Sequence, residues 1–292
     1  MNEIYNEVSE KIIKSLESGL APWQRPWNFS SCPKNFSTGN HYSGFNIFIL
    51  INEGFVSNQW GTAKQIFEKG GRIKKGEKHT KIIFWKFKKV AKIDKNGEIL
   101  EEEIPLLRCH QVFNIEQTTG LEKYLEPVEK SLEFCPIDNA EKIINDFKNA
   151  PRIIKQGSSA FYSQLGDFVN IPDKSHFISI EEFYCTLFHE LGHSTGHPKR
   201  LNRFNEISKV HSKKEEYSRE ELIAEFSSSF LMAEAGIFTK AIEKNSASYI
   251  KGWSKFLRED KFSLVTCSKE AQKVSNYILG RHASLINIDQ AE

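Results

Sequence analysis

The chain has 292 residues, enough for two ordinary domains, and its net charge of +2 says little about partners. Hydrophobic residues make up 39% and aromatic residues 12%, which is typical of a globular protein and argues against a disordered chain. No apolar run reaches the length of about eighteen residues that suggests a membrane span, and the N-terminal segment lacks the apolar core of a signal peptide. The five cysteines include no Cys-x-x-Cys pair. We therefore expect a cytoplasmic protein with reduced thiols and no membrane partner.

The first half of the chain predicts an α+β domain. An amphipathic helix over 4–16 closes at Gly19, and a turn-rich aromatic stretch follows it at 21–46. Asn96-Gly97 is a strong signal for a two-residue hairpin loop. It would place Lys95 opposite Glu98 and Lys92 opposite Glu101. The remaining expected elements are helices at 47–51 and 62–70 and the hairpin strands at 81–93 and 98–114.

The second half predicts a small sheet followed by two long helices. We place the boundary near residue 130, within the proline-containing linker at 120–136, and so divide the chain into domains 1–130 and 131–292. The expected elements are a helix at 137–149, two short strands at 152–155 and 159–163, and then the segment 167–172. They are followed by a helix starting after Ser179, a polar loop at 198–216, a helix at 218–235 capped by Ser218, and one or two terminal helices.

The helix after Ser179 carries the motif His-Glu-x-x-His. On an α-helix, His189 and His193 lie on one face about one turn apart, where both imidazoles can bind one metal. Glu190 lies between them and suits a general base acting on a metal-bound water, as in zincin peptidases. Apolar neighbours predict that this helix is buried, and buried histidines need partners. We therefore expect Zn²⁺, or another divalent metal, at this place.

A third ligand must come from another segment. His197 stands at the wrong offset for the zincin class that continues the motif with a third histidine, so we expect it to be structural or to support a ligand. The helix at 218–235 offers Glu220, Glu221 and Glu225. We choose Glu221 as the ligand and Glu225, one turn on, as the acid that accepts a hydrogen bond from a ligand histidine. The candidates for donors that stabilise transition-state charge are Tyr162, His197, His211 and Tyr217.

Residues 60–95 form a strongly basic segment. They contain twelve Lys or Arg and three acids, with aromatic residues among the lysines, which suits single-stranded nucleic acid. The alternative to nucleic-acid binding is a structural role. In this interpretation the segment forms part of a β-hairpin, and its acidic second strand neutralises part of the positive charge. The charges of the glycine-containing loop, Arg72, Lys74, Lys75 and Lys78, are not cancelled by that pairing.

Both halves together resemble the ArdC-type antirestriction proteins of plasmids and conjugative elements. The resemblance runs through short motifs spaced over 20–235. They include Pro22-Trp23, Pro26-Trp27, Thr38-Gly39, Tyr42 to Asn46, Trp60 to Gln65, Lys75 to Glu77, Val112 to Asn114, Ala160 to Ser163, Asp167, His189 to His197, Arg200-Leu201 and Glu220 to Glu225.

This resemblance implies an N-terminal domain that binds single-stranded DNA and a C-terminal zincin-like metallopeptidase domain. It implies a protein of a mobile element that protects incoming single-stranded DNA from restriction. Our candidates for DNA contact are Trp23, Trp27, Tyr42, Asn46, Lys74, Lys75, Lys78 and Trp85.

Two other functions remain open. One is a site-specific intracellular metalloprotease whose basic domain recruits a protein substrate. The other is a non-catalytic DNA-binding protein with a structural zinc. The sequence names neither a peptide substrate nor a preferred DNA sequence.

Overall fold

The computed structural model describes residues 3–18, 33–93, 99–125, 136–204, 213–237, 247–259 and 263–281. It is an α+β protein, as predicted. The N-terminal part holds a four-stranded sheet in the order β1 (Lys34–Asn35), β2 (Gln59–Thr62), β5 (Ile99–Asn114) and β4 (Thr80–Ile93). Two helices, α1 (Glu3–Glu17) and α2 (Phe45–Asn52), accompany it. The helix α3 (Ala63–Glu68) starts at a capping box formed by Thr62 and Gln65.

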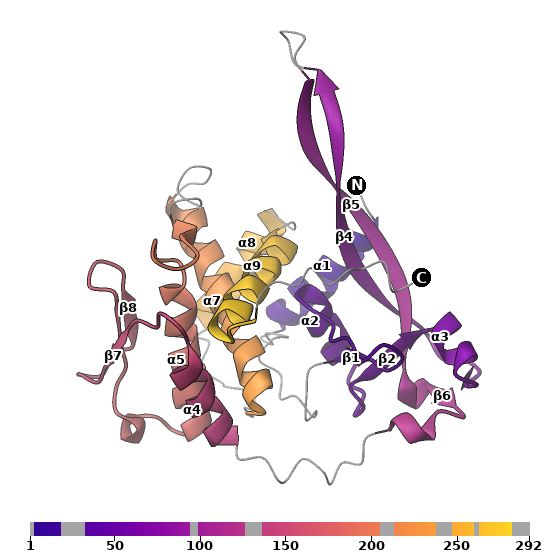
Figure 1. Cartoon of the computed structure of the whole chain (residues 1–292), viewed down its shortest axis with the longest axis horizontal. Helices are drawn as coiled ribbons and strands as arrows, with labels where there is room; N and C mark the ends of the chain where they lie inside the picture. The colour runs from indigo at the N-terminus through magenta and orange to yellow at the C-terminus, as the bar shows by residue number, and fades with distance from the viewer. Residues whose placement is uncertain are drawn as a thin grey trace.

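The strands β4 and β5 form a long hairpin that projects from the body of the molecule (Figure 1). Its register differs from our prediction. Lys92 lies opposite Leu100, and Glu101 lies opposite Ala91, so the predicted pairing of Lys92 with Glu101 is wrong. The last described pair is Ile93 with Ile99. A two-residue loop at 96–97 would pair Ile93 with Leu100, so the described register differs from the predicted one by one position. Lys95 and Glu98 lie outside the described residues.

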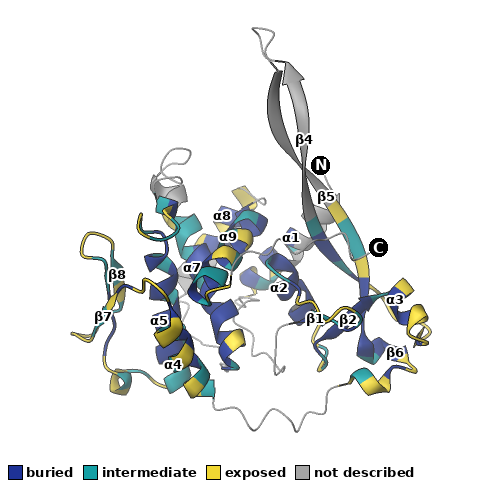
Figure 2. Ribbon diagram, viewed as in Figure 1, coloured by how far each residue is buried: buried dark blue, intermediate teal, exposed yellow. Residues whose placement is uncertain are grey.

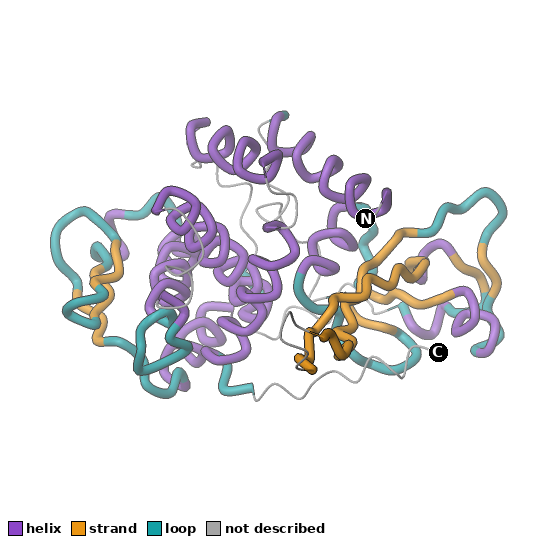
Figure 3. The backbone as a smooth tube through the Cα atoms, turned by 90° about the horizontal axis from the view of Figure 1, so that it is seen from above, coloured by secondary structure: helices purple, strands orange, loops and turns teal. Residues whose placement is uncertain are grey.

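The C-terminal part begins with α4 (Pro136–Asp146) and a small sheet. The sheet has the order β7 (Arg152–Ile154), β9 (Phe168–Asn170), β8 (Phe161–Ser163), with β7 parallel and β8 antiparallel to β9. The helices α5 (Ile180–Ser194), α7 (Lys213–Ala235), α8 (Ala247–Glu259) and α9 (Ser263–Ile278) follow. These helices lie between the small sheet and the N-terminal sheet (Figure 3). No described helix is long and apolar enough to cross a membrane.

The start of α5 confirms one capping prediction, and the start of α7 corrects another. The Ser179 hydroxyl accepts a hydrogen bond from the backbone N–H of Glu182, which caps α5 as expected. In contrast, α7 begins at Lys213, so Ser218 lies inside the helix and is not its N-cap. The residues before Ser218 are mostly Lys and Glu, which favour helix and allow α7 to extend N-terminally.

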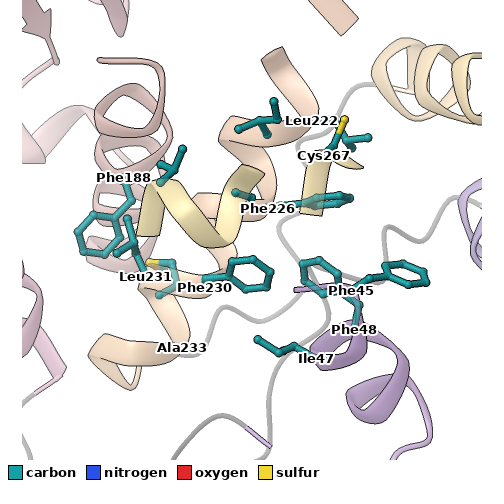
Figure 4. Packing of buried hydrophobic residues seen from close by; sticks show 14 of the residues in the cluster. Phe45, Ile47, Phe48, Phe188, Leu222, Phe226, Phe230, Leu231, Ala233 and Cys267 are labelled. Atoms are coloured by element: carbon teal, nitrogen blue, oxygen red, sulfur yellow. The ribbon is translucent and has the colours of Figure 1, made fainter. Parts of the chain in front are cut away.

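The hydrophobic core extends across both halves of the chain. The ring of Phe48 in α2 lies 4.9 Å from that of Phe226 and 5.1 Å from that of Phe230, both in α7 (Figure 4). In addition, α1 packs against α8, and the α1 residues Ile13 and Leu16 are fully buried in the same cluster. Buried residues are found in α1 and α2 as well as in the C-terminal helices (Figure 2). Residue 130 lies outside the described residues, so our domain boundary stays a prediction. The helices α1 and α2 of the N-terminal part pack against helices of the C-terminal part.

The helix α2 also holds the hairpin. The Asn46 side chain donates to the carbonyl of Ile83 in β4 at 2.7 Å and accepts from the N–H of the same residue at 2.8 Å. This pair of bonds satisfies two buried backbone groups. Through α2, the base of the hairpin is connected to the helix that carries the glutamates.

Candidate metal centre and nucleic-acid interface

The helices α5 and α7 approach closely at Gly192. A Cβ atom on this residue would lie 3.4 Å from Cα of Ala224 and 3.6 Å from Cβ of Ser227. Small residues on both helices permit this short separation. It brings the imidazoles of α5 within reach of the carboxylates of α7.

His189, His193 and Glu221 converge at this contact. The two Nε2 atoms are 3.0 Å apart, and the Glu221 oxygens lie 3.6 Å from Nε2 of His189 and 3.5 Å from Nε2 of His193. Ligand atoms of a tetrahedral zinc site, with bonds of about 2.0–2.1 Å, lie about 3.3–3.4 Å from one another. The three side chains thus form a ligand set of two nitrogens and one carboxylate that fits a divalent cation.

Two further carboxylates contact the outer nitrogens of the imidazoles. The Glu225 Oε1 atom lies 3.5 Å from Nδ1 of His189, close to the ligand histidine that we expect it to support. The Glu220 Oε1 atom lies 3.2 Å from Nδ1 of His193, a contact that the sequence reasoning missed. Burial lowers the pKa of His189, but the carboxylates of Glu221, Glu225 and Glu190 outweigh it and raise this pKa to about 9. The site therefore has a negative field that favours a cation.

An arginine beyond the motif holds Glu220 in place. The Arg203 side chain donates to both carboxylate oxygens of Glu220, at 2.9 Å from Nε and 2.6 Å from Nη2. It also donates to the Thr195 hydroxyl at 2.8 Å and to the carbonyl of Gly192 at 3.2 Å. Burial raises the pKa of Glu220, but Arg203 and His193 oppose this and leave the pKa below its usual value. Arg203 is only 4% exposed, so these bonds are shielded from solvent.

The predicted general base and the candidate donors for transition-state charge differ in their burial and in their hydrogen-bond partners. Glu190 is buried on α5 between the two histidines, with 8% of its surface exposed. Tyr217 is more than half exposed, and its hydroxyl donates to the carboxylate of Glu221. His197 accepts the backbone N–H of Lys199 at Nδ1, and this Nδ1 lies 3.9 Å from an oxygen of Asp167. His211 lies outside the described residues.

A second arginine with a buried side chain, Arg200, joins the end of α5 to the small sheet. It donates to the carboxylate of Asp167, to the Tyr162 hydroxyl at 3.0 Å and to the carbonyl of Ser194 at 2.6 Å. The Tyr162 hydroxyl in turn donates to Asp167 at 2.9 Å. These bonds, with that to Arg200 the strongest, lower the pKa of Asp167 to about 2. Burial, followed by the bond to Asp167, raises the pKa of Tyr162 to about 12.

The candidates for DNA contact fall into three groups. Lys74, Lys75 and Lys78 are exposed on the loop around β3 (Arg72–Ile73), which pairs with β6 (Thr118–Thr119). Tyr42 and Asn46 are buried: Asn46 binds Ile83, and burial raises the pKa of Tyr42 to about 12. Burial gives these two residues a place in the core instead of on a DNA-binding surface.

The tryptophans form the third group. The backbone of Trp85 lies in β4 opposite Leu107, on the projecting hairpin. Trp23 and Trp27 lie outside the described residues.

The comparisons with known proteins agree with this architecture. A model of the N-terminal domain of the anti-restriction factor ArdC matches residues 2–113, and a model of zincin-like metallopeptidases matches 138–270. A DNA primase TraC of Escherichia coli is 33% identical over 94% of the chain, although the chain spans only 27% of that primase.

Two solved structures cover the chain almost completely. The metal-free crystal structure of the antirestriction protein ArdC from plasmid R388 is 31% identical, with a TM-score of 0.74, covering 95% of this chain and 97% of that one. The Mn(II)-bound structure of that protein is 29% identical, with a TM-score of 0.72, covering 97% of this chain and 100% of the other. The metal of that relative and the ligand set described above point to a divalent metal in this protein. The chain belongs to the ArdC-type family of antirestriction proteins.

Proposed function

We propose that this protein binds single-stranded DNA through its N-terminal part and hydrolyses peptide bonds at a zinc centre in its C-terminal part, as an antirestriction factor of a mobile element. The observation that carries the proposal is the convergence of His189, His193 and Glu221 beside the buried Glu190, in a chain of an antirestriction family.

The proposed centre has ligands of defined roles. His189, His193 and Glu221 would hold the cation, and their two nitrogens and one carboxylate suit zinc. A bound divalent cation supplies Lewis-acid activation of water and polarises a carbonyl. Glu225 Oε1 lies 3.5 Å from Nδ1 of His189, and a hydrogen bond accepted from this Nδ1 would keep Nε2 unprotonated and facing the ligand set.

The remaining chemistry belongs to Glu190. Its carboxylate takes the proton of the attacking water and returns it to the leaving amine. The carboxylate of Glu190 contributes to the raised pKa of His189, which places it near the ligand set. The Tyr217 hydroxyl, bonded to Glu221, orients that carboxylate from the exposed side of the site.

Among the candidates for DNA contact, we favour the exposed lysines of the loop that follows β3. Lys75 and Lys78 are exposed there, and neither lies in the hairpin strands β4 and β5. Ammonium groups on such a loop bind phosphates of any sequence, which suits DNA whose sequence is not fixed.

One substitution, Glu190→Gln, tests the two parts of the proposal separately. We expect the variant to keep metal and single-stranded DNA binding while losing protection of incoming DNA, because only proton transfer is removed. Protection that survives in a metal-loaded Glu190→Gln protein would show that hydrolysis is not needed. Purified wild-type protein that binds no single-stranded DNA would refute the DNA-binding part.

A further inference from the structure

The contacts around His193 differ from those around the other histidine of the centre. Its Nδ1 atom faces Glu220, and both oxygens of Glu220 are engaged by the planar side chain of Arg203. One oxygen, Oε1, is shared between His193 and Arg203. The carboxylate thus lies between the imidazole and the guanidinium.

The two-point contact with Arg203 fixes the orientation of this carboxylate. A fork of two N–H groups matches a carboxylate in only a narrow range of angles, so the plane of Glu220 is set by the arginine. A carboxylate of this kind accepts hydrogen bonds and does not donate them. The hydrogen of a neutral His193 is therefore held on Nδ1, and the lone pair of Nε2 faces the ligand set.

Arg203 is itself anchored to the helix that carries His193. It bonds the carbonyl of Gly192 and the hydroxyl of Thr195, which in turn donates to the same carbonyl at 2.7 Å. These residues flank His193 in the chain, near the end of α5 where the unpaired carbonyls favour a cation. Arg203 thus connects the end of α5 to α7 on the Nδ1 side of the His193 imidazole.

We infer that Arg203 and Glu220 are a positioning pair that orients His193 and thereby sets the metal affinity of the centre. The inference rests on the proposed metal centre and adds to it two residues that do not touch the cation. Outer partners of this kind typically change metal affinity by about 10–100-fold when they are removed.

Arg200 provides a matched control. Its side chain is 2% exposed, against 4% for Arg203, and it also joins the end of α5 to a carboxylate, that of Asp167. Its hydrogen bonds to Asp167, Tyr162, Asn149 and Ser194 involve none of the three proposed ligands. Arg200→Lys therefore removes a comparable buried network without disturbing His193.

The experiment measures zinc affinity by competition with a chelator, and unfolding of the metal-free protein, in the full chain. We expect Arg203→Lys and Glu220→Gln each to weaken zinc binding by about 10–100-fold. We expect Arg200→Lys to lower stability with zinc affinity within about threefold of wild type. The double variant should bind no more weakly than about the weaker single variant, because the two residues act as one unit.

The outcomes separate this inference from the proposed function. If wild-type protein binds zinc and the folded Arg203→Lys and Glu220→Gln proteins bind it equally well, the positioning role is refuted and the centre stands. Equal losses of affinity in all three single variants would also refute it, since general destabilisation would then explain them. Wild-type protein that binds no zinc would overturn both. Should Arg203→Lys fail to fold, the nearly isosteric Glu220→Gln carries the test.

Discussion

The substitution Gly192→Val tests whether close packing of α5 and α7 creates the metal centre. The valine Cβ would lie 3.4 Å from Cα and 3.7 Å from Cβ of Ala224, and its two methyl groups extend beyond that position. Overpacking of this kind costs about 1–3 kcal/mol. Catalytic and metal sites need their groups within about 0.5 Å of the working geometry. A separation of the helices by about 1 Å would move Glu221 outside that range, so we expect at least about a tenfold loss of metal affinity.

The matched control is Gly192→Ala. Its single methyl group makes a contact that is tight by a few tenths of an ångström, while alanine favours the helix by about 0.8–1.0 kcal/mol over glycine. We expect its stability and metal affinity to stay close to wild type. The assays are denaturant unfolding of the metal-free proteins and competition with a chelator. A folded Gly192→Val protein with wild-type metal affinity would refute the argument that this crossing places Glu221.

Three further perturbations test other parts of the structure. Phe48→Ala should lower the free energy of unfolding by about 3–5 kcal/mol, because it empties a buried contact between α2 and α7; a loss below about 1 kcal/mol would contradict the shared core. Asp167→Asn should remove stability that is fully present above the unfolded pKa near 3.8 and is lost as the pH falls toward about 2. The difference in unfolding free energy between wild type and this variant should therefore shrink over that interval, and a constant difference would refute the ion pair with Arg200. Joint replacement of Lys75 and Lys78 by Ala should reduce the salt slope of single-stranded DNA binding by about 1.4, at about 0.7 per phosphate; an unchanged slope would move the contact surface elsewhere.

Local signals in the sequence predicted the helices of the site well. The spacing of His189 and His193 and the cap at Ser179 depend only on neighbouring residues, and the structure confirms the helix and the cap. The i, i+4 relation of Glu221 and Glu225 was also readable, because both lie on one face of α7. The structure brings these two carboxylates to opposite nitrogens of His189.

The role of Glu220 was not readable in the same way. It is rotated by about 100° from Glu221 around α7, and from the sequence we choose Glu221 and Glu225, which share a face, and assign no role to Glu220. Two imidazoles on a crossing helix present their outer nitrogens in different directions, however, so adjacent glutamates can reach different rings. Only the angle and distance between α5 and α7 decide this, and no local pattern encodes them. Arg203 was missed for the same reason, since it lies in the segment between α5 and α7, outside the motif and outside both of these helices.

Two features of the fold depended on distant parts of the chain. The Asn96-Gly97 signal predicted a hairpin but gave the wrong register, because Ile93 pairs with Ile99 whereas a two-residue loop at 96–97 would pair it with Leu100. The apolar run of α2 predicted burial but not its partner. Its packing against α7 joins residues about 180 positions apart, and hydrophobic contacts are not directional.

The most direct test of the metal centre is the zinc affinity and stoichiometry of wild type compared with His193→Ala and Glu221→Ala. The geometry predicts one tightly bound ion per wild-type chain and a loss of that binding in both variants, because each removes one of three ligands that lie within 4.8 Å of one another. A folded Glu221→Ala protein that binds one ion with wild-type affinity would contradict the account.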